Sequence, residues 1–156
     1  MKAASSVQVV GRYRFKTYRA GTRDLLRTTP WIKNAVTAAS GHGLNIIARR
    51  LVGDLTYDIL VTQAKIGTGT TAPTTSDTDL ETPVTSGILV ANQGATGGVA
   101  TLEFFIADSQ LPDGTYEEFG IFAGNRLFAR SLIAPSYTKA SNEDTACEYV
   151  ITFSNA

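Results

Sequence analysis

The side chains best suited to chemistry in this 156-residue chain do not complete a known catalytic pattern. The single histidine, His42, is flanked by glycines with Ser40 nearby, but no G-x-S-x-G signature of a serine hydrolase is present. Gly67-Thr68-Gly69 begins like a phosphate-binding loop and then departs from both glycine-rich phosphate patterns. We therefore expect no enzyme and no cofactor, and interpret His42 as a loop or helix-boundary residue.

Three acidic residues, Asp77, Asp79 and Glu81, are spaced like carboxylates that could bind a metal ion. The segment lacks the glycine and the twelfth-position glutamate of an EF-hand calcium loop. Aspartate and serine side chains readily bond their own backbone in turns. We interpret these residues as turn and cap formers and predict no bound metal; a weak calcium site is the alternative.

A pair of adjacent acidic residues, Glu117 and Glu118, would point to opposite faces of a strand, so they do not form an acid/base pair. The one on the buried face needs a basic partner. Arg130 lies on the next predicted strand, beyond the hairpin turn Gly124-Asn125, at about the height of Glu118. We predict an ion pair between Glu118 and Arg130.

The composition favours a protein that works in an assembly. Only 18% of the residues are charged, and 14 basic residues balance 14 acidic ones. Zero net charge promotes association and predicts no broad attraction to nucleic acid or membranes. Cys147 is the single cysteine, which excludes an internal disulfide. No signal-peptide core or membrane-spanning apolar run is present, so we expect assembly in the host cytoplasm.

The N-terminal residues 1–30 are predicted to form a β arm. Between residues 7 and 18, apolar and polar side chains alternate with the period of a half-buried strand. The polar side of this strand is basic, with aromatic residues interleaved. That pattern could bind nucleic acid, but on a neutral protein we interpret it as an exposed interface strand.

Residues 31–52 are predicted to contain the helical segment. Ile32, Val36 and Ala39 have helical spacing, and the pattern resumes from Leu44 after two glycines that weaken a helix. This predicts either one broken helix or a loop followed by a helix of about 8–10 residues.

The remainder of the chain is predicted to be strands. Short alternating segments spaced by about ten residues favour an antiparallel β-sandwich, so the fold class is mainly β. The loop at 67–83 is poor in apolar residues and rich in Gly, Thr and Pro. We predict that it is ordered in the assembled particle and lies against the sheet or a neighbour; a mobile solvent loop is the alternative. Residues 31–156 are predicted to form one compact unit. The predicted strands are 57–66, 87–92, 98–107, 115–123, 126–134 and 145–154.

Two stretches, residues 65–84 and 111–156, resemble bacteriophage tail and virion proteins of the tail-collar fibre type. A G-x-G-x-x-x-P-x-x-x-D-x-x-L loop, an E-x-G-I/L-F strand, an L-F-A-R strand and a final Y-x-I-x-F strand occur in that order. Residues 31–51 resemble the helical segment that precedes the loop in such proteins. The matched positions that we take as interface or structural candidates are Gly67, Gly69, Pro73, Asp77, Leu80, Glu118, Gly120, Phe122 and Arg130.

The resemblance implies a non-enzymatic structural protein of the phage particle. Because many fibre proteins of this type are much longer, we expect a compact tail, collar, neck or baseplate subunit. Its expected partners are copies of itself in a symmetric homo-oligomer and other phage virion proteins. Two alternatives stay open: a capsid decoration protein, and a glycan-binding receptor module whose aromatic candidates are Trp31, Tyr116 and Tyr137.

Overall fold

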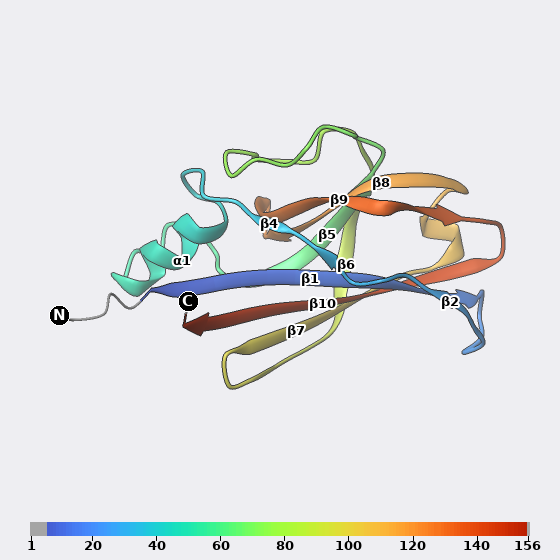
Figure 1. Cartoon of the computed structure of the whole chain (residues 1–156), viewed down its shortest axis with the longest axis horizontal. Helices are drawn as coiled ribbons and strands as arrows, with labels where there is room; N and C mark the ends of the chain where they lie inside the picture. Colours follow the sequence, from blue (N-terminus) through green and yellow to red (C-terminus); the bar gives the residue numbers. More distant parts are fainter. Residues whose placement is uncertain (1–5, 156) are drawn as a thin grey trace.

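The computed structural model describes residues 6–155, which form an antiparallel, mainly β fold with one short α-helix (Figure 1). The predicted fold class is therefore confirmed. In chain order the elements are β1 (Val7–Arg19), β2 (Leu25–Thr28), β3 (Ile32–Lys33), β4 (Ala35–Val36), α1 (Gly43–Leu51), β5 (Val61–Gly67), β6 (Pro83–Thr96), β7 (Val99–Ile106), a 3-10 turn η1 (Asp108–Gln110), β8 (Gly114–Ala123), β9 (Arg126–Lys139) and β10 (Glu143–Asn155).

The strands form two layers that share β6. The order along the sheet is β2-β1-β10-β7-β6-β5-β8-β9-β4, with β3 also paired to β1. The first part of β6 pairs with β5 and the second part with β7. Gly87 has a φ of 68°, and the register with β7 shifts between Val90 and Asn92. These irregularities let one strand run from one layer into the other.

The first strand is an integral part of the sheet. β1 pairs with β10 along its whole length, from Val7 opposite Asn155 to Arg19 opposite Glu143. Its alternation is as predicted, because Tyr13 and Phe15 are fully buried. The segment assigned to an N-terminal arm thus supplies part of the core, while residues 1–5 of that arm lie outside the described residues.

The helical segment is shorter than residues 31–52. Its first part is extended: β3 and β4 pair with β1 and β9, and the Asn34 amide donates to the Gly11 carbonyl. A prediction of one broken helix is wrong here, whereas a loop followed by a short helix is right. The backbone groups of β1 and β9 that would otherwise be unpaired form hydrogen bonds with this segment. These bonds favour the extended conformation more than the weak helical spacing of its apolar residues favours a helix. Residues 25–36 consequently join the edges of both layers.

Several strand ends also differ from the prediction. β5 begins at Val61 rather than at residue 57, β6 already begins at Pro83, and β9 continues to Lys139. The exposed parts of β6 and β9 carry polar residues and show no alternation of apolar and polar side chains. The predicted strands are therefore shorter than the observed ones. The loop between β5 and β6 is left with residues 68–82.

The core between the layers is aromatic. Phe119 on β8 lies 5.1 Å from Tyr13 and 5.3 Å from Phe15 between ring centroids. The buried Tyr137 hydroxyl hydrogen-bonds with the hydroxyls of Thr17 and Thr145, each at 2.7 Å. Buried polar groups that are satisfied in this way make the packing of the two layers specific. No helix within residues 6–155 is long and apolar enough to cross a membrane.

Candidate functional site

A buried ion pair lies at the centre of the candidate site. The guanidinium Nε of Arg130 on β9 donates to Glu118 Oε2 on β8 at 3.0 Å, and Nη2 lies 2.9 Å from the same oxygen. The two side chains are 3% and 0% exposed. The predicted pairing of Glu118 with Arg130 is confirmed.

The Glu118 carboxylate also binds both ends of the loop 68–82. Oε1 accepts the backbone N–H groups of Gly69 at 3.1 Å and Thr82 at 2.7 Å. Oε2 accepts the N–H of Glu81 at 3.0 Å. A buried carboxylate needs several donors of this kind to offset its lost hydration. Glu118 thereby clamps the two arms of the loop side by side above β8.

Arg130 binds the middle of the same loop. Nη1 lies 2.9 Å from Asp77 Oδ2, and Nη2 donates to the Thr71 carbonyl at 2.9 Å. Asp77 in turn accepts the backbone N–H and the hydroxyl of Thr74, so it forms the turn that the sequence predicted. Burial alone would raise the pKa of Asp77, but the bonds from Thr74 and Arg130 outweigh it and lower the pKa below its ordinary value.

Glycine allows the loop to approach the sheet this closely. A Cβ atom on Gly67 would lie 2.2 Å from the Thr82 carbonyl oxygen, and one on Gly69 would lie 2.6 Å from Glu118 Oε1. No side chain other than hydrogen fits at either position. The two glycines of the predicted loop motif are therefore explained by contact with Glu118 and the opposite arm of the loop.

An apolar contact completes the attachment. Leu80, the apolar anchor predicted for the loop, is buried in a small cluster with Phe122 on β8 and Leu127 on β9. It also lies over Gly120, where a Cβ atom would come within 2.9 Å of its Cδ2. Pro73 is half-buried just before the Thr74 turn. The nine candidate residues thus belong to one attachment of loop to sheet, and the loop lies against the sheet, which is one of the two positions predicted for it.

The three carboxylates considered as metal ligands are bound by basic side chains and backbone N–H groups, and Arg130 lies near both Asp77 and, at 3.9 Å, Glu81. Asp77 binds Arg130, Asp79 lies 2.9 Å from Lys65 Nζ, and Glu81 accepts the N–H of Thr71 at 2.8 Å. Across residues 6–155, no group of three or more His, Cys, Asp or Glu side chains is arranged to hold a metal ion. The chemistry of the site is therefore electrostatic attachment of a loop.

The histidine occupies the helix boundary that the sequence indicated. His42 is the residue before α1, is buried, and places Nδ1 3.2 Å from the Leu127 carbonyl. Ser40 Oγ accepts a hydrogen bond from Arg49 and not from His42. The structure does not bring these two residues together as a nucleophile and base.

A second buried cation was missed by sequence reasoning. Lys139, at the end of β9, is held by the carboxylates of Asp108 and Asp113, the latter at 2.9 Å. These groups attach η1 and the start of β8 to β9. The pairing of Gly114 with Lys139 places Asp113 beside the lysine. Counting residues outward along both strands from the Gly124-Asn125 turn could have placed Asp113 near Lys139. The same count could not have placed Asp108, because its position depends on η1.

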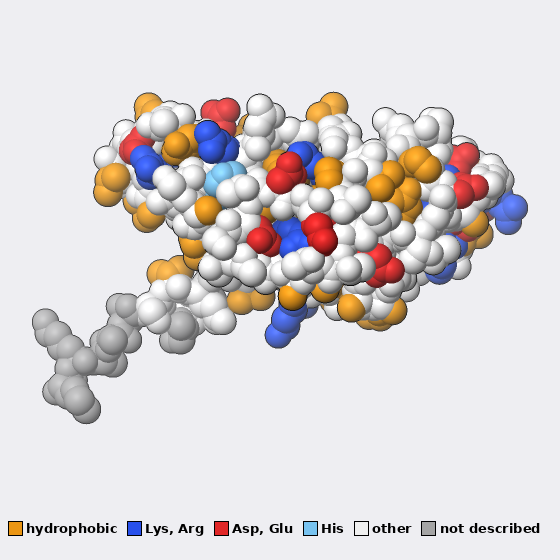
Figure 2. Space-filling view, turned by 90° about the horizontal axis from the view of Figure 1, so that it is seen from above, with side chains coloured by type: hydrophobic (Ala, Val, Ile, Leu, Met, Phe, Trp, Pro, Cys, Tyr) orange, Lys and Arg blue, Asp and Glu red, His pale blue; other side chains and the backbone are white. Residues whose placement is uncertain are grey.

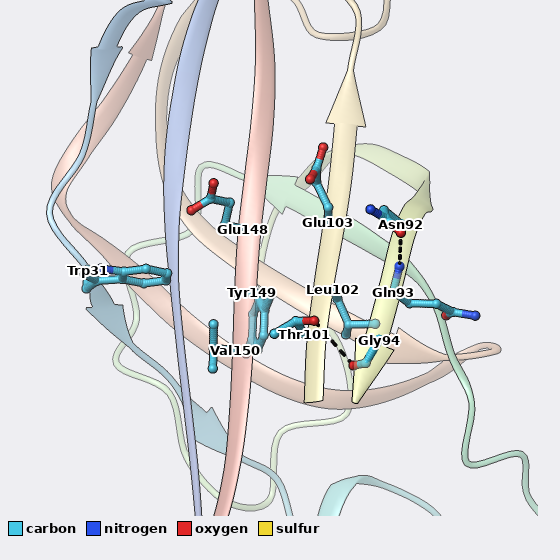
Figure 3. A pocket seen from close by; sticks show the side chains of 10 residues that line it. All are labelled: Trp31, Asn92, Gln93, Gly94, Thr101, Leu102, Glu103, Glu148, Tyr149 and Val150. Carbon is cyan, nitrogen blue, oxygen red and sulfur yellow. Dashed lines mark hydrogen bonds between the residues drawn. The ribbon is translucent and has the colours of Figure 1, made fainter. Parts of the chain in front are cut away.

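The aromatic residues considered for glycan binding separate into two groups. Tyr116 and Tyr137 are buried in the core and cannot serve as platforms. Trp31 is 38% exposed and borders a pocket of about 280 Å³ with Glu103, Glu148 and Val150 (Figure 3). The guanidinium carbons of Arg12 and Arg14 lie 4.7 Å and 4.5 Å from the Trp31 ring centroid, so the ring already contacts its own chain.

The basic face of β1 is also partly neutralised within the chain. Arg14 Nε and Lys16 Nζ each lie 2.7 Å from the Glu148 carboxylate on β10. Glu148 lies directly opposite Glu103 on β7, so the outer surface mixes both signs of charge. This arrangement does not form the continuous basic stripe that would follow a nucleic-acid backbone.

The fold and site define a β-sandwich with a loop that is held on the sheet by ionic, hydrogen-bonding and apolar contacts. No family model matches the chain, and neither a curated protein nor a solved structure shows significant similarity to it. The resemblance to phage tail and virion proteins is therefore carried by the motif residues alone and stays a prediction.

Proposed function

We propose that the chain is a non-enzymatic structural subunit of a bacteriophage particle, in the tail, collar, neck or baseplate. It assembles with copies of itself into a symmetric ring and contacts neighbouring virion proteins. The protein is made and assembled in the host cytoplasm and acts in the virion.

The observation that carries this proposal is the convergence of the nine motif residues on one loop attachment. We take this buried ion pair to be retained for conformational specificity, since a loop conformation that broke it would leave an uncompensated buried charge. Apart from the bond between them, Glu118 and Arg130 form their hydrogen bonds with the loop 68–82. Their partners there are backbone atoms and the Asp77 carboxylate. The pair is thus suited to fixing the shape of a surface rather than to acting on a substrate.

A fixed loop is a suitable docking element. The residues on its outer side, including Thr70, Ala72 and Thr78, are exposed and uncharged. Because the loop is ordered before a partner arrives, binding does not include the entropy loss of ordering it. Such a loop could bind a neighbouring subunit through modest contacts that are repeated around a ring.

The composition of the whole chain supports assembly. The net charge is zero, so electrostatic repulsion between copies is weak. Large apolar side chains such as Leu51, Val52 and Leu89 are mostly exposed. Apolar surface of this extent usually marks a contact with another protein.

Particle composition tests the proposal directly. Mass spectrometry of purified particles should detect the wild-type chain in a fixed ratio to the major structural proteins. Substituting the outer loop residues, as in Ala72→Arg with Thr78→Arg, should reduce incorporation at least tenfold. The matched control Ser86→Arg, on the exposed part of β6, should incorporate normally. Absence of the wild-type chain from particles would refute the proposal.

Location in the particle separates the proposal from a capsid decoration protein, and antibody labelling of intact particles distinguishes tail from capsid. The exposed Trp31 with Glu103 and Glu148 beside it keeps a glycan-binding module as the second candidate. Specific hits on a glycan array that disappear in Trp31→Ala would favour that candidate.

A further inference from the structure

An apolar groove opens between the two layers at the end of the molecule that carries α1. Its volume is about 380 Å³. The walls come from α1, from the residues before β5 and its first residue, and from β6, β7, β9 and β10. They include Ile47, Ile59, Leu60, Phe128, Ile151 and Phe153. A groove of this size can receive apolar side chains from another molecule, since ligand pockets begin at about 300 Å³.

The apolar stripe of α1 continues from this groove onto open surface. Ile46 is buried against the sheet and Ile47 lines the groove. Leu51 is one turn beyond Ile47 and therefore on the same side of the helix, but it is 83% exposed. Val52 and Leu55 are 81% and 71% exposed. The outer half of an amphipathic stripe is left without a cover.

The exposed segment begins and ends at the groove. The chain leaves the groove at Ile47 and returns to it at Ile59, so Leu51, Val52 and Leu55 project from the rim between these points. Figure 2 shows hydrophobic side chains gathered on the surface at the end that carries α1. One chain thus carries a protruding apolar segment, residues 51–55, beside an apolar groove.

The charges of this segment are turned toward its own backbone and side chains. Arg49 lies 2.6 Å from Asp54 Oδ2, and Arg50 donates to the Tyr57 carbonyl at 2.9 Å. Arg49 is therefore paired within the segment, whereas Arg50 is held by a carbonyl oxygen alone and keeps a buried Nε without a hydrogen-bond partner. Neither guanidinium is the group that forms the apolar tip at Leu51 and Val52.

The exposed apolar area approaches that of a stable contact. The exposed fractions are 83, 81, 71, 37, 58 and 38% for Leu51, Val52, Leu55, Ile59, Leu60 and Phe153. At roughly 180 Å² per residue, these fractions correspond to about 650 Å² of surface. A standard protein interface takes about 800 Å² from each partner. The groove and segment together approach that size.

We propose that the groove of one copy receives residues 51–55 of a second copy of this chain. Protrusion and groove are both apolar and lie on the same surface, so a two-fold pair of copies buries both protrusions at once. A ring forms by the same contact if the rotation between copies is not two-fold. This inference deepens the proposed function, because it names the surface through which copies assemble.

The test is sedimentation velocity over a range of concentrations, with three single variants. Leu51→Glu places a charge on the protrusion, and Leu60→Lys places one in the groove. Leu25→Glu is the matched control, because Leu25 is 52% exposed and lies on β2, away from the groove. All three positions are more than half exposed, so the fold should survive, as circular dichroism can verify.

The wild-type chain and the control should form the same oligomer, and each of the other variants alone should have at least a tenfold higher dissociation constant. An equimolar mixture of Leu51→Glu and Leu60→Lys should reassociate. There, the native protrusion of one chain meets the native groove of the other, and the remaining contact joins Glu with Lys. If one variant unfolds, comparison of the other variant with the control still tests the proposal.

Two results would overturn the inference in distinguishable ways. If the oligomer tolerates both substitutions, this surface is not the interface between copies, but self-assembly remains as proposed. A wild-type chain that stays monomeric at about 100 µM refutes the self-association, and with it the ring, since a working interface should form at micromolar concentrations. A mixture that fails to reassociate refutes the fit between protrusion and groove.

Discussion

Arg130 lies directly across the β8–β9 hairpin from Gly120, and its guanidinium reaches along β8 to Glu118, which is itself paired with Leu132. The missing side chain at Gly120 leaves space that Leu80 of the loop fills. The glycine thus gives room for the apolar anchor directly across the hairpin from the arginine. The ionic and the apolar parts of the loop attachment therefore meet at a single point of the hairpin.

Removing the arginine should destabilise the protein strongly. In Arg130→Ala, the fully buried Glu118 loses its cation, and Asp77 and the Thr71 carbonyl lose a donor. Loss of one member of a buried pair costs about 3–5 kcal/mol. Urea denaturation should show this loss, whereas Arg126→Ala at the exposed hairpin end should change stability by less than about 1 kcal/mol. Equal stability of both variants would mean that the pair contributes nothing.

The loop glycine should tolerate no side chain. A Cβ atom in Gly69→Ala would lie 2.6 Å from both Glu118 Oε1 and Glu81 Cβ, so one arm of the loop must move away from β8. Overpacking of this kind costs about 1–3 kcal/mol. Gly94→Ala is the control, since its nearest atom would be at 3.7 Å. Thermal unfolding measures the difference, and similar melting points for the two variants would contradict the close approach.

Hydrogen exchange should locate the same effect. In Gly69→Ala, the amides of Glu81 and Thr82, which donate to Glu118, should exchange faster than in the wild type. Amides of the β1–β10 pair should keep their protection. Uniform loss of protection over the whole chain would show that the loop does not open separately from the sheet.

Part of this site could be predicted from sequence because its determinants are local. Glu118 and Arg130 flank one short hairpin, and a charge on a buried strand face must have a partner. The loop can also be recognised in the sequence by Gly67, Gly69 and Asp77, because these residue types have strong backbone preferences.

The unpredicted parts depend on distant partners. The segment 32–36 becomes extended because it reaches free edges of β1 and β9, which lie far away in the chain. Lys139 finds Asp108 only after η1 has formed. The groove arises where α1 leaves a gap between two layers. No window of sequence contains these relationships, since each is decided by packing of the whole domain.

Acid should loosen the loop through Asp77. Its pKa is lowered in the folded protein from the ordinary value of 3.8. A carboxylate with a lowered pKa stabilises the fold at pH values above its unfolded pKa, and this stabilisation is lost as the pH falls through the folded pKa. Wild-type stability should therefore exceed that of Asp77→Asn at pH 7, and the difference should shrink below about pH 4.

Urea denaturation at pH 7 and pH 3 gives the comparison. Asp24→Asn is the control, because Asp24 is exposed and lies 3.9 Å from Arg19, where an ion pair contributes little. A difference between wild type and Asp77→Asn that stays constant between the two pH values would show that the Asp77 charge does not hold the loop.

The two buried cations of β9 should act independently. Arg130 and Lys139 are separated along one strand by about 30 Å at roughly 3.3 Å per residue, and they bind different partners. Lys139→Met should destabilise the η1 end and leave the loop amides protected. The effects of Lys139→Met and Arg130→Ala should add within about 0.5 kcal/mol in the double variant. A coupling well above about 1 kcal/mol would instead mean that β9 transmits strain between its two ends and that the loop is tied to the opposite end of the sandwich.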